Sequence, residues 1–107
     1  MWIQETFINE TKGYVCGEPD KYEAFTDDVG RLFRALQREH GRCISKMYRD
    51  TDNGAQAVGW VFEKRMKYSD ARGNDLERDY YIQNVWVGLF EQPDKVTREV
   101  FPMVLGA

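Results

Sequence analysis

The feature that most constrains the fold is a long run in which apolar and polar residues alternate. In residues 57–68, one set of alternate positions is mainly apolar and the other set carries most of the charges. A period of two is typical of a β-strand with one buried face. Trp60 and Phe62 belong to the apolar set, whereas Arg65 and Lys67 belong to the other. The run therefore predicts a half-buried strand with its rings toward the core.

Other strand patterns surround this run. Residues 42–49 alternate loosely, and the turn at 50–54 ends in Asn-Gly, a pair that tight hairpins favour. Residues 80–90 are apolar on both sides, which indicates a strand near the centre of a sheet. Because strands joined by short turns usually pair, we expect a three-stranded meander over 42–92. Aromatic and β-branched residues at 2–8 indicate a further strand in the same sheet.

One amphipathic helix is predicted at residues 27–40. Thr26 is expected to cap its start, and Gly41 fits the left-handed position just past its end. The apolar positions follow the spacing of a buried stripe and are Val29, Leu32, Phe33 and Leu36. At about 100° per residue, three arginines lie together on the opposite face, namely Arg31, Arg34 and Arg38. We expect the helix to pack by one side and to expose these arginines on the other.

The predicted fold class is α+β, an antiparallel sheet of four to five strands with one amphipathic helix packed on one face. The 107 residues contain 42% hydrophobic residues and no repeat or linker, which favours a single domain over 1–107. Its segments are an N-terminal strand and loop, the helix, the meander, and a C-terminal tail or edge strand: 1–25, 26–41, 42–92 and 93–107.

Cysteine usage and hydropathy bear on the compartment. With only Cys16 and Cys43, the chain lacks the four or more cysteines of a small disulfide framework, so both are expected to be reduced, small and buried. Residues 1–10 do not resemble a secretory signal, and no apolar run approaches the roughly 20 residues that span a bilayer. We therefore expect a cytoplasmic protein that does not enter a membrane.

No pattern in the sequence points to catalysis. His40 is the only histidine and is expected to be a solvated residue at the helix end. Asp50 and Asp52 begin a turn that resembles a calcium loop, but Trp60 stands where the bidentate Glu would be. There is no CxxC pair and no glycine-rich phosphate loop. We predict no catalytic residue, no cofactor and no metal, and only a deep pocket with convergent polar groups would favour an enzyme.

Charge is distributed unevenly along the chain. The net charge is −5 over residues 1–30, +5 over 31–67 and −3 over 68–107. A basic middle segment that stays exposed after folding would attract an anionic partner. The candidate residues for binding a partner or a nucleic acid are Arg31, Arg34, Arg38, Lys64, Arg65 and Lys67.

Two sequence segments carry a resemblance. The run GWVFEKRMKY, a polar turn and then YYIQNVWVGLFEQP resemble a pattern in small uncharacterised proteins of actinobacteria and their phages. The similarity covers residues 42–92. It implies a paired hairpin with Trp60 and Trp86 as core anchors, and a phage or mobile-element origin. No functional residue is carried over, because no activity is assigned to that pattern.

Two functions from different classes fit these observations. The first is a non-enzymatic protein-interaction domain, phage-encoded, that binds a host or virion protein, and the apolar stretch 100–105 supports it. The alternative is a nucleic-acid-binding domain that uses the basic region 31–67, with rings and bases alternating along one strand. The simpler interpretation of those rings is structural, which makes Trp60, Phe62 and Trp86 candidate core anchors. Pairing of two copies through a sheet edge or the tail is left open.

Overall fold

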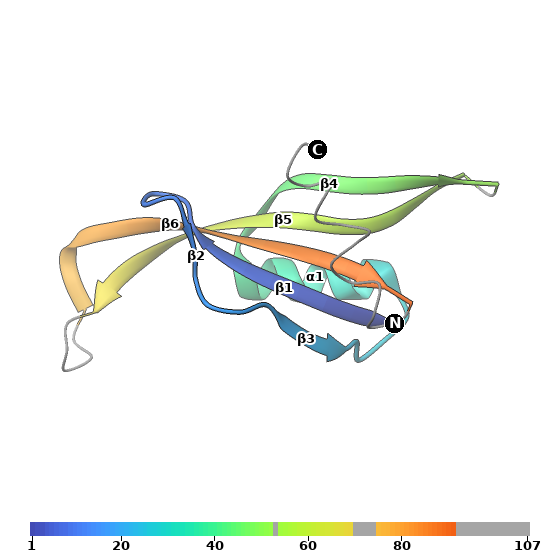
Figure 1. The fold of residues 1–107 in the computed structure, drawn as a ribbon, viewed down its shortest axis with the longest axis horizontal. Helices are drawn as coiled ribbons and strands as arrows, with labels where there is room; N and C mark the ends of the chain where they lie inside the picture. Colours follow the sequence, from blue (N-terminus) through green and yellow to red (C-terminus); the bar gives the residue numbers. More distant parts are fainter. Residues whose placement is uncertain (53, 70–74, 92–107) are drawn as a thin grey trace.

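The computed structural model describes residues 1–52, 54–69 and 75–91. The predicted tail 93–107, with its apolar stretch, lies outside these residues. The described helix and strands follow one another in this order: β1 (Trp2–Asn9), β2 (Tyr14–Val15), β3 (Asp20–Glu23), α1 (Val29–His40), β4 (Arg42–Thr51), β5 (Gly54–Ser69) and β6 (Asp75–Phe90) (Figure 1).

The strands form one antiparallel sheet in the order β2-β1-β6-β5-β4, with β3 also paired to β1. The predicted α+β class is confirmed, and the described residues form a sheet of six strands rather than four or five. The outer edge of β1 is shared, since β3 pairs with Trp2–Glu5 and β2 pairs with Ile8 and Asn9. β6 lies between β1 and β5, so its apolar character on both sides agrees with its central place.

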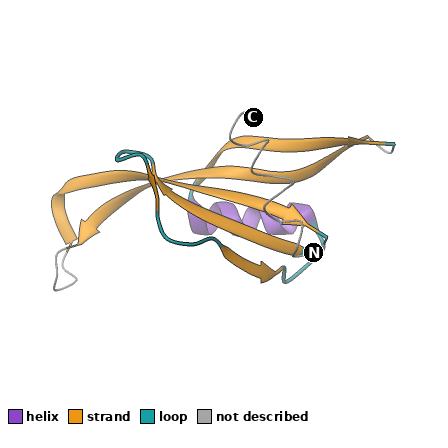
Figure 2. Ribbon diagram, in the orientation of Figure 1, coloured by secondary structure: helices purple, strands orange, loops and turns teal. Residues whose placement is uncertain are grey.

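Helix α1 covers one face of this sheet (Figure 2). Along a strand successive side chains point to opposite faces, so the register tells which residues share the helix side. We call this side the helix face and the other the outer face. The buried core on the helix face consists of Ile3, Leu32, Leu36, Trp60, Phe62, Val85, Val87 and Leu89. The predicted stripe therefore packs against the alternating apolar positions of three strands.

The start of α1 differs from the prediction. The helix begins at Val29, and Asp28 rather than Thr26 is its N-cap, because the Asp28 side chain accepts a hydrogen bond from Arg31 N at 3.2 Å. Thr26 lies two residues before this N-cap, and its Oγ1 accepts a hydrogen bond from Asp28 N at 3.1 Å. Asp28 has extended backbone angles, so the helix starts only after it. At the other end Gly41 follows the helix with a positive φ of 103°, as predicted, but its ψ of −153° lies outside the left-handed helical region. Its N–H donates to Gln37 O.

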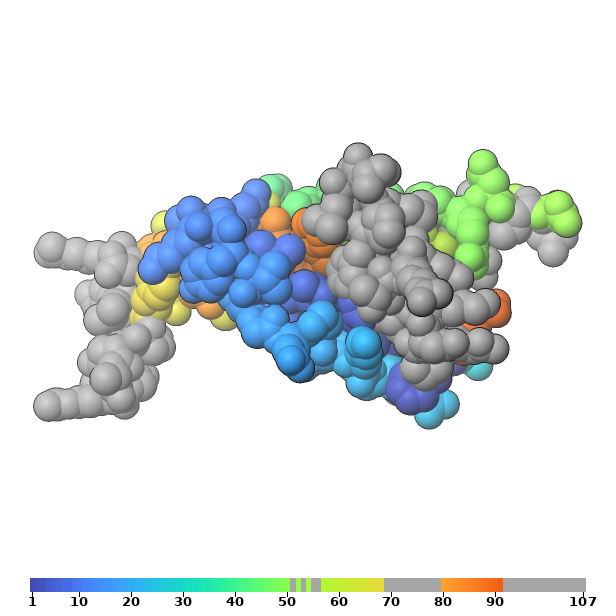
Figure 3. Space-filling view, in the orientation of Figure 1, coloured from blue at the N-terminus to red at the C-terminus, as the bar shows by residue number. Residues whose placement is uncertain are grey.

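The hairpin of β5 and β6 extends beyond its neighbours (Figure 1). Residues 64–69 and 75–82 pair with each other beyond the registers of β5 with β4 and of β6 with β1, and we call them the arm. The β1–β2 turn lies against its base (Figure 3). There Lys12 Nζ is 5.0 Å from the Tyr68 ring centroid, and Asn9 Nδ2 donates to Tyr68 OH at 3.5 Å. These contacts support a hairpin that would otherwise stand alone.

The two cysteines do not form a disulfide. Cys16 and Cys43 are both unpaired thiols and both half-buried rather than fully buried. Cys43 Sγ donates to Ser45 O at 3.3 Å.

Among the helices in the described part of the chain, none is long and apolar enough to cross a membrane.

The close approach at Gly41 gives a test of the helix-to-strand connection. A Cβ at this position would overlap the carbonyl oxygen of Glu63 in β5, in addition to the strain of a positive φ. We expect Gly41→Ala to lower the free energy of unfolding by about 3 kcal/mol or more in urea denaturation. Gly17→Ala is the matched control, because Gly17 also has a positive φ but open space around it. It should cost only about 1 to 2 kcal/mol, and equal losses would contradict the close approach.

Candidate functional site

The three helix arginines face away from the sheet, as the helical spacing indicates. Arg31, Arg34 and Arg38 are all exposed. None of them takes part in a salt bridge within the part of the chain that the structure describes. The outer side of α1 therefore presents a row of cations to which no described acidic side chain is bound.

The structure separates the basic residues of β5 into two groups. The register of β5 with β6 places Lys64 on the helix face, together with Phe62, and places Arg65 and Lys67 on the outer face. Lys64 Nζ donates to Glu39 O at the end of α1, at 3.4 Å. The six predicted binding residues therefore do not form one continuous surface.

Arg65 and Lys67 lie instead against an aromatic ring on the arm. Arg65 Cζ is 4.0 Å and Lys67 Nζ 5.9 Å from the centroid of the Tyr80 ring. A cation at this distance over a ring is attracted to its electron-rich face. The two exposed bases thus stabilise the arm through Tyr80, and sequence reasoning did not single out that tyrosine.

The three candidate core anchors are not equivalent. Trp60 and Phe62 are 3% and 0% exposed and belong to the core beneath α1, where both contact the Phe33 ring. Trp86 is only half-buried and lies on the outer face, because it pairs with Val61 across the strands. Trp86 therefore lies outside the core beneath α1, because the alternation along β6 turns its side chain away from the helix.

One further cation joins the arginine row. Lys46 of β4 pairs with Trp60, which puts it on the helix face, and its Nζ is 5.0 Å from the centroid of the Phe33 ring. Strand alternation alone does not place it there, because a register shift between Cys43 and Ser45 puts Cys43 and Lys46 on the same face although they are three residues apart. We define the helix-side basic surface as Arg31, Arg34, Arg38, Lys46 and Lys64.

A buried polar cluster ties the end of α1 to β1 and β3. Glu5, only 6% exposed, accepts two hydrogen bonds on the same oxygen, Oε1. Tyr22 OH donates to it at 2.6 Å, and His40 Nε2 donates at 2.9 Å. A second carboxylate oxygen, Glu39 Oε2, lies 4.0 Å from the same histidine nitrogen. Three chain segments thus meet at one carboxylate.

The prediction of a solvated His40 is wrong. This residue is 5% exposed, and its ring packs edge-on against Phe7 and also lies near Phe62. The sequence indicates this burial, because His40 follows Leu32 and Leu36 at intervals of four residues and so continues the buried stripe. This spacing, and not the position at the end of the helix, determines that His40 is buried.

The environment of the cluster shifts two pKa values in opposite directions. Burial alone raises the pKa of Glu5, but the hydrogen bonds from His40 and Tyr22 and the positive charge of His40 outweigh it and lower this pKa. Burial, followed by the hydrogen bond and the negative charge of Glu5, raises the pKa of Tyr22 well above its ordinary range. The hydrogen bond between them therefore stabilises Glu5 as a charged carboxylate and Tyr22 as a neutral phenol.

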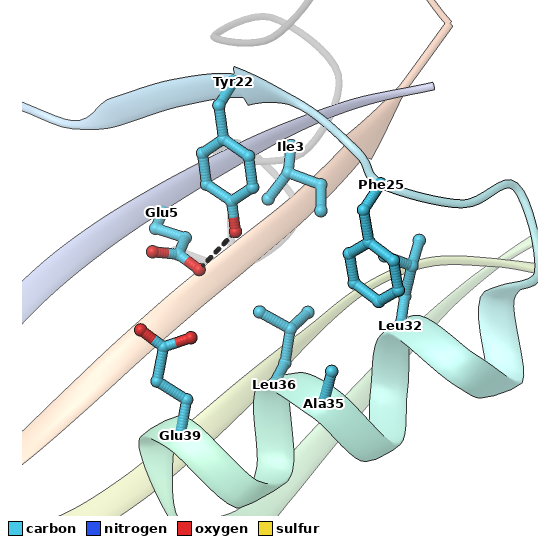
Figure 4. Close-up of a pocket in the computed structure, with 8 residues that line it drawn as sticks. All are labelled: Ile3, Glu5, Tyr22, Phe25, Leu32, Ala35, Leu36 and Glu39. Carbon is cyan, nitrogen blue, oxygen red and sulfur yellow. Dashed lines mark hydrogen bonds between the residues drawn. The ribbon is translucent and has the colours of Figure 1, made fainter.

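A pocket of about 270 Å³ opens beside this cluster, between β1, β3 and α1. Figure 4 shows Glu5 and Tyr22 on one side of it and Glu39 on the facing helix. The remaining lining is mostly apolar and consists of Ile3, Phe25, Leu32, Ala35 and Leu36. His40 does not line the pocket, so the arrangement offers carboxylates and a hydroxyl for binding rather than a histidine for proton transfer.

The described residues hold no group of three or more His, Cys, Asp or Glu side chains that is suited to a metal ion. No family model, no curated protein and no solved structure matches the chain. The candidate sites therefore rest on geometry alone, and they are the helix-side basic surface and the pocket on the flank of α1.

The low pKa of Glu5 makes its contribution to stability sensitive to acid. Because the folded-state pKa lies below the ordinary value of 4.5, this contribution is complete above pH 4.5 and is lost as the pH falls further. We expect the difference in unfolding free energy between the wild type and Glu5→Gln to shrink between about pH 5 and pH 3 in urea titrations. Glu10→Gln, an exposed control, should show no such change, and a constant difference for Glu5→Gln would contradict the hydrogen-bonded carboxylate.

The raised pKa of Tyr22 gives a separate test at high pH. A group of this kind contributes fully below its ordinary pKa of 10.0, and the contribution is lost as the pH rises above it. We expect the stability advantage of the wild type over Tyr22→Phe to fall between about pH 10 and pH 12. Tyr81, whose pKa burial also raises, is present in both proteins and cancels in the comparison. An advantage that is unchanged at pH 12 would mean that Tyr22 is not bonded to Glu5.

Proposed function

We propose that this chain is a non-enzymatic protein-interaction domain that binds an acidic surface of another protein through the helix-side basic surface. The observation that carries the proposal is the exposed row of Arg31, Arg34 and Arg38, none of which forms a salt bridge within the described residues. Guanidinium groups form paired hydrogen bonds with carboxylates, so such a row suits an acidic partner.

The scaffold under this surface supports a docking role. Leu32 and Leu36 fix α1 on the sheet from below, so the arginines project from a rigid element rather than a loop. Lys64 and Lys46 extend the positive charge from the helix to β5 and β4. Electrostatic complementarity of this kind speeds association and selects partners more than it adds affinity.

A protein partner suits the site better than a nucleic acid. Modules that bind single strands stack bases on exposed rings beside the cations. Here Trp60 and Phe62 are sealed beneath the helix, and Arg65 and Lys67 lie on the other face of the sheet. The nucleic-acid alternative depended on exposed rings and on a continuous basic region, and neither of these supports it here. The phage origin and the cytoplasmic location remain predictions that rest on the sequence.

Reversing the helix charges should remove partner binding. In affinity isolation from the native cell lysate, we expect wild type to recover an acidic protein in stoichiometric amount. The variant Arg31→Glu/Arg34→Glu/Arg38→Glu should recover about tenfold less, because three attractive contacts become repulsive. These exposed changes keep residues that form helices well, so folding should be retained and is checked by circular dichroism.

The matched control reverses the same kind of charge on the outer face. Arg65→Glu/Lys67→Glu should recover the partner as wild type does. Equal losses in the two variants, or no partner for wild type, would contradict the proposal. A mobility shift with single-stranded or duplex DNA at about 50 mM salt, abolished by the helix variant, would favour the nucleic-acid alternative instead.

A further inference from the structure

We propose that the pocket between β1, β3 and α1 binds a small organic ammonium ion with an apolar body. The ammonium group would lie between the carboxylates of Glu5 and Glu39, and the body would lie along the apolar wall. This site is separate from the helix-side basic surface, because its lining comes from the flank of α1 and not from its outer arginines. Its failure would therefore leave the proposed protein interaction untouched.

The charge of the cluster favours a cation. Glu5 and Glu39 both line the pocket, and an oxygen of each lies within 4.0 Å of His40 Nε2. Even a fully charged His40 neutralises only one of the two carboxylates, so the cluster keeps a net negative charge in either state of the histidine. The ammonium group of Lys64 bonds the backbone oxygen of Glu39, and among the described residues it forms no ion pair with either carboxylate.

The hydrogen bonds of the cluster leave one acceptor open. Tyr22 OH and His40 Nε2 both bond Glu5 Oε1, and no bond to Glu5 Oε2 occurs among the described residues. These two donors hold the carboxylate in place and keep it ionised inside a buried site. A carboxylate held in this way can accept a charge-assisted hydrogen bond from an ammonium group with little further ordering.

The rest of the pocket selects the body of the ligand. Ile3, Leu32 and Leu36 form an apolar wall, and the ring of Phe25 lies at one end (Figure 4). At about 270 Å³ the pocket is slightly smaller than the roughly 300–1,000 Å³ of drug-sized sites, so it suits a ligand with one ring or a short alkyl chain. An alkylammonium ion satisfies both the carboxylates and this wall.

The probe for the test is phenethylammonium chloride, titrated into the whole chain and followed by backbone amide shifts in NMR. We expect Kd of about 0.1 to 1 mM, with shifts centred on Tyr22, Ala35 and Glu39. The neutral analogue 2-phenylethanol should bind at least about tenfold more weakly, because it lacks the charge. A capped lysine, Nα-acetyl-lysine methylamide, identifies the source: binding here too would show that a partner's lysine side chain can supply the ammonium group.

Variants separate the charge from the cavity. Glu39→Gln removes one carboxylate at an exposed position where folding is not at risk, and it should weaken phenethylammonium binding about tenfold. Ala35→Trp fills the pocket from the helix side and should abolish binding. The control Glu10→Gln removes an exposed carboxylate at the far end of β1 and should change nothing.

Three results would overturn the proposal. The first is equal binding of 2-phenylethanol and phenethylammonium, which would make the pocket a simple apolar slot. The second is the same loss of affinity in Glu10→Gln as in Glu39→Gln, which would indicate a general charge effect. The third is the absence of pocket shifts up to about 10 mM, beyond which such a contact is too weak to be a site.

Discussion

The structure depends on the packing of one side of α1 against Trp60 and Phe62. A helix advances by about 100° per residue, so burying Leu32 and Leu36 also turns His40 toward the sheet. The same rotation directs the arginine row to solvent. The charged surface and the buried polar cluster are therefore two consequences of a single packing arrangement, and neither can be moved without the other.

This arrangement gives the two flanks of the helix opposite preferences for charge. The outer side carries cations that no described acidic side chain neutralises. The flank toward β3 carries Glu39 and faces Glu5, whose carboxylate is fixed by Tyr22. An anionic protein surface and a small cation could thus bind within one helix width of each other without competing. The buried carboxylate is kept ionised by its donors, so the pocket retains its charge near neutral pH.

Much of the fold follows from local patterns, because alternation and helical spacing report directly which side of an element is buried. They identified the strands around Trp60, the helix, and the central place of the last strand. The pairing of β3 with β1 has no such signal, since four mostly exposed residues around Tyr22 show no alternation. That pairing brings Tyr22 to Glu5. Local sequence patterns therefore could not predict the buried polar cluster or the pocket beside it. In contrast, the two-residue period of the strand already predicted that Lys64 and Arg65 lie on opposite faces of the sheet.

The most direct test of this account is the position of the His40 ring in solution. Proton–proton NOEs measured on the intact chain should connect the ring of His40 with the rings of Phe7 and Phe62, which lie 5.8 Å and 6.2 Å away between centroids. Such contacts require the whole buried side of α1 to face the sheet. A His40 ring that shows NOEs only within its own helical turn would contradict the packing from which both proposed sites follow.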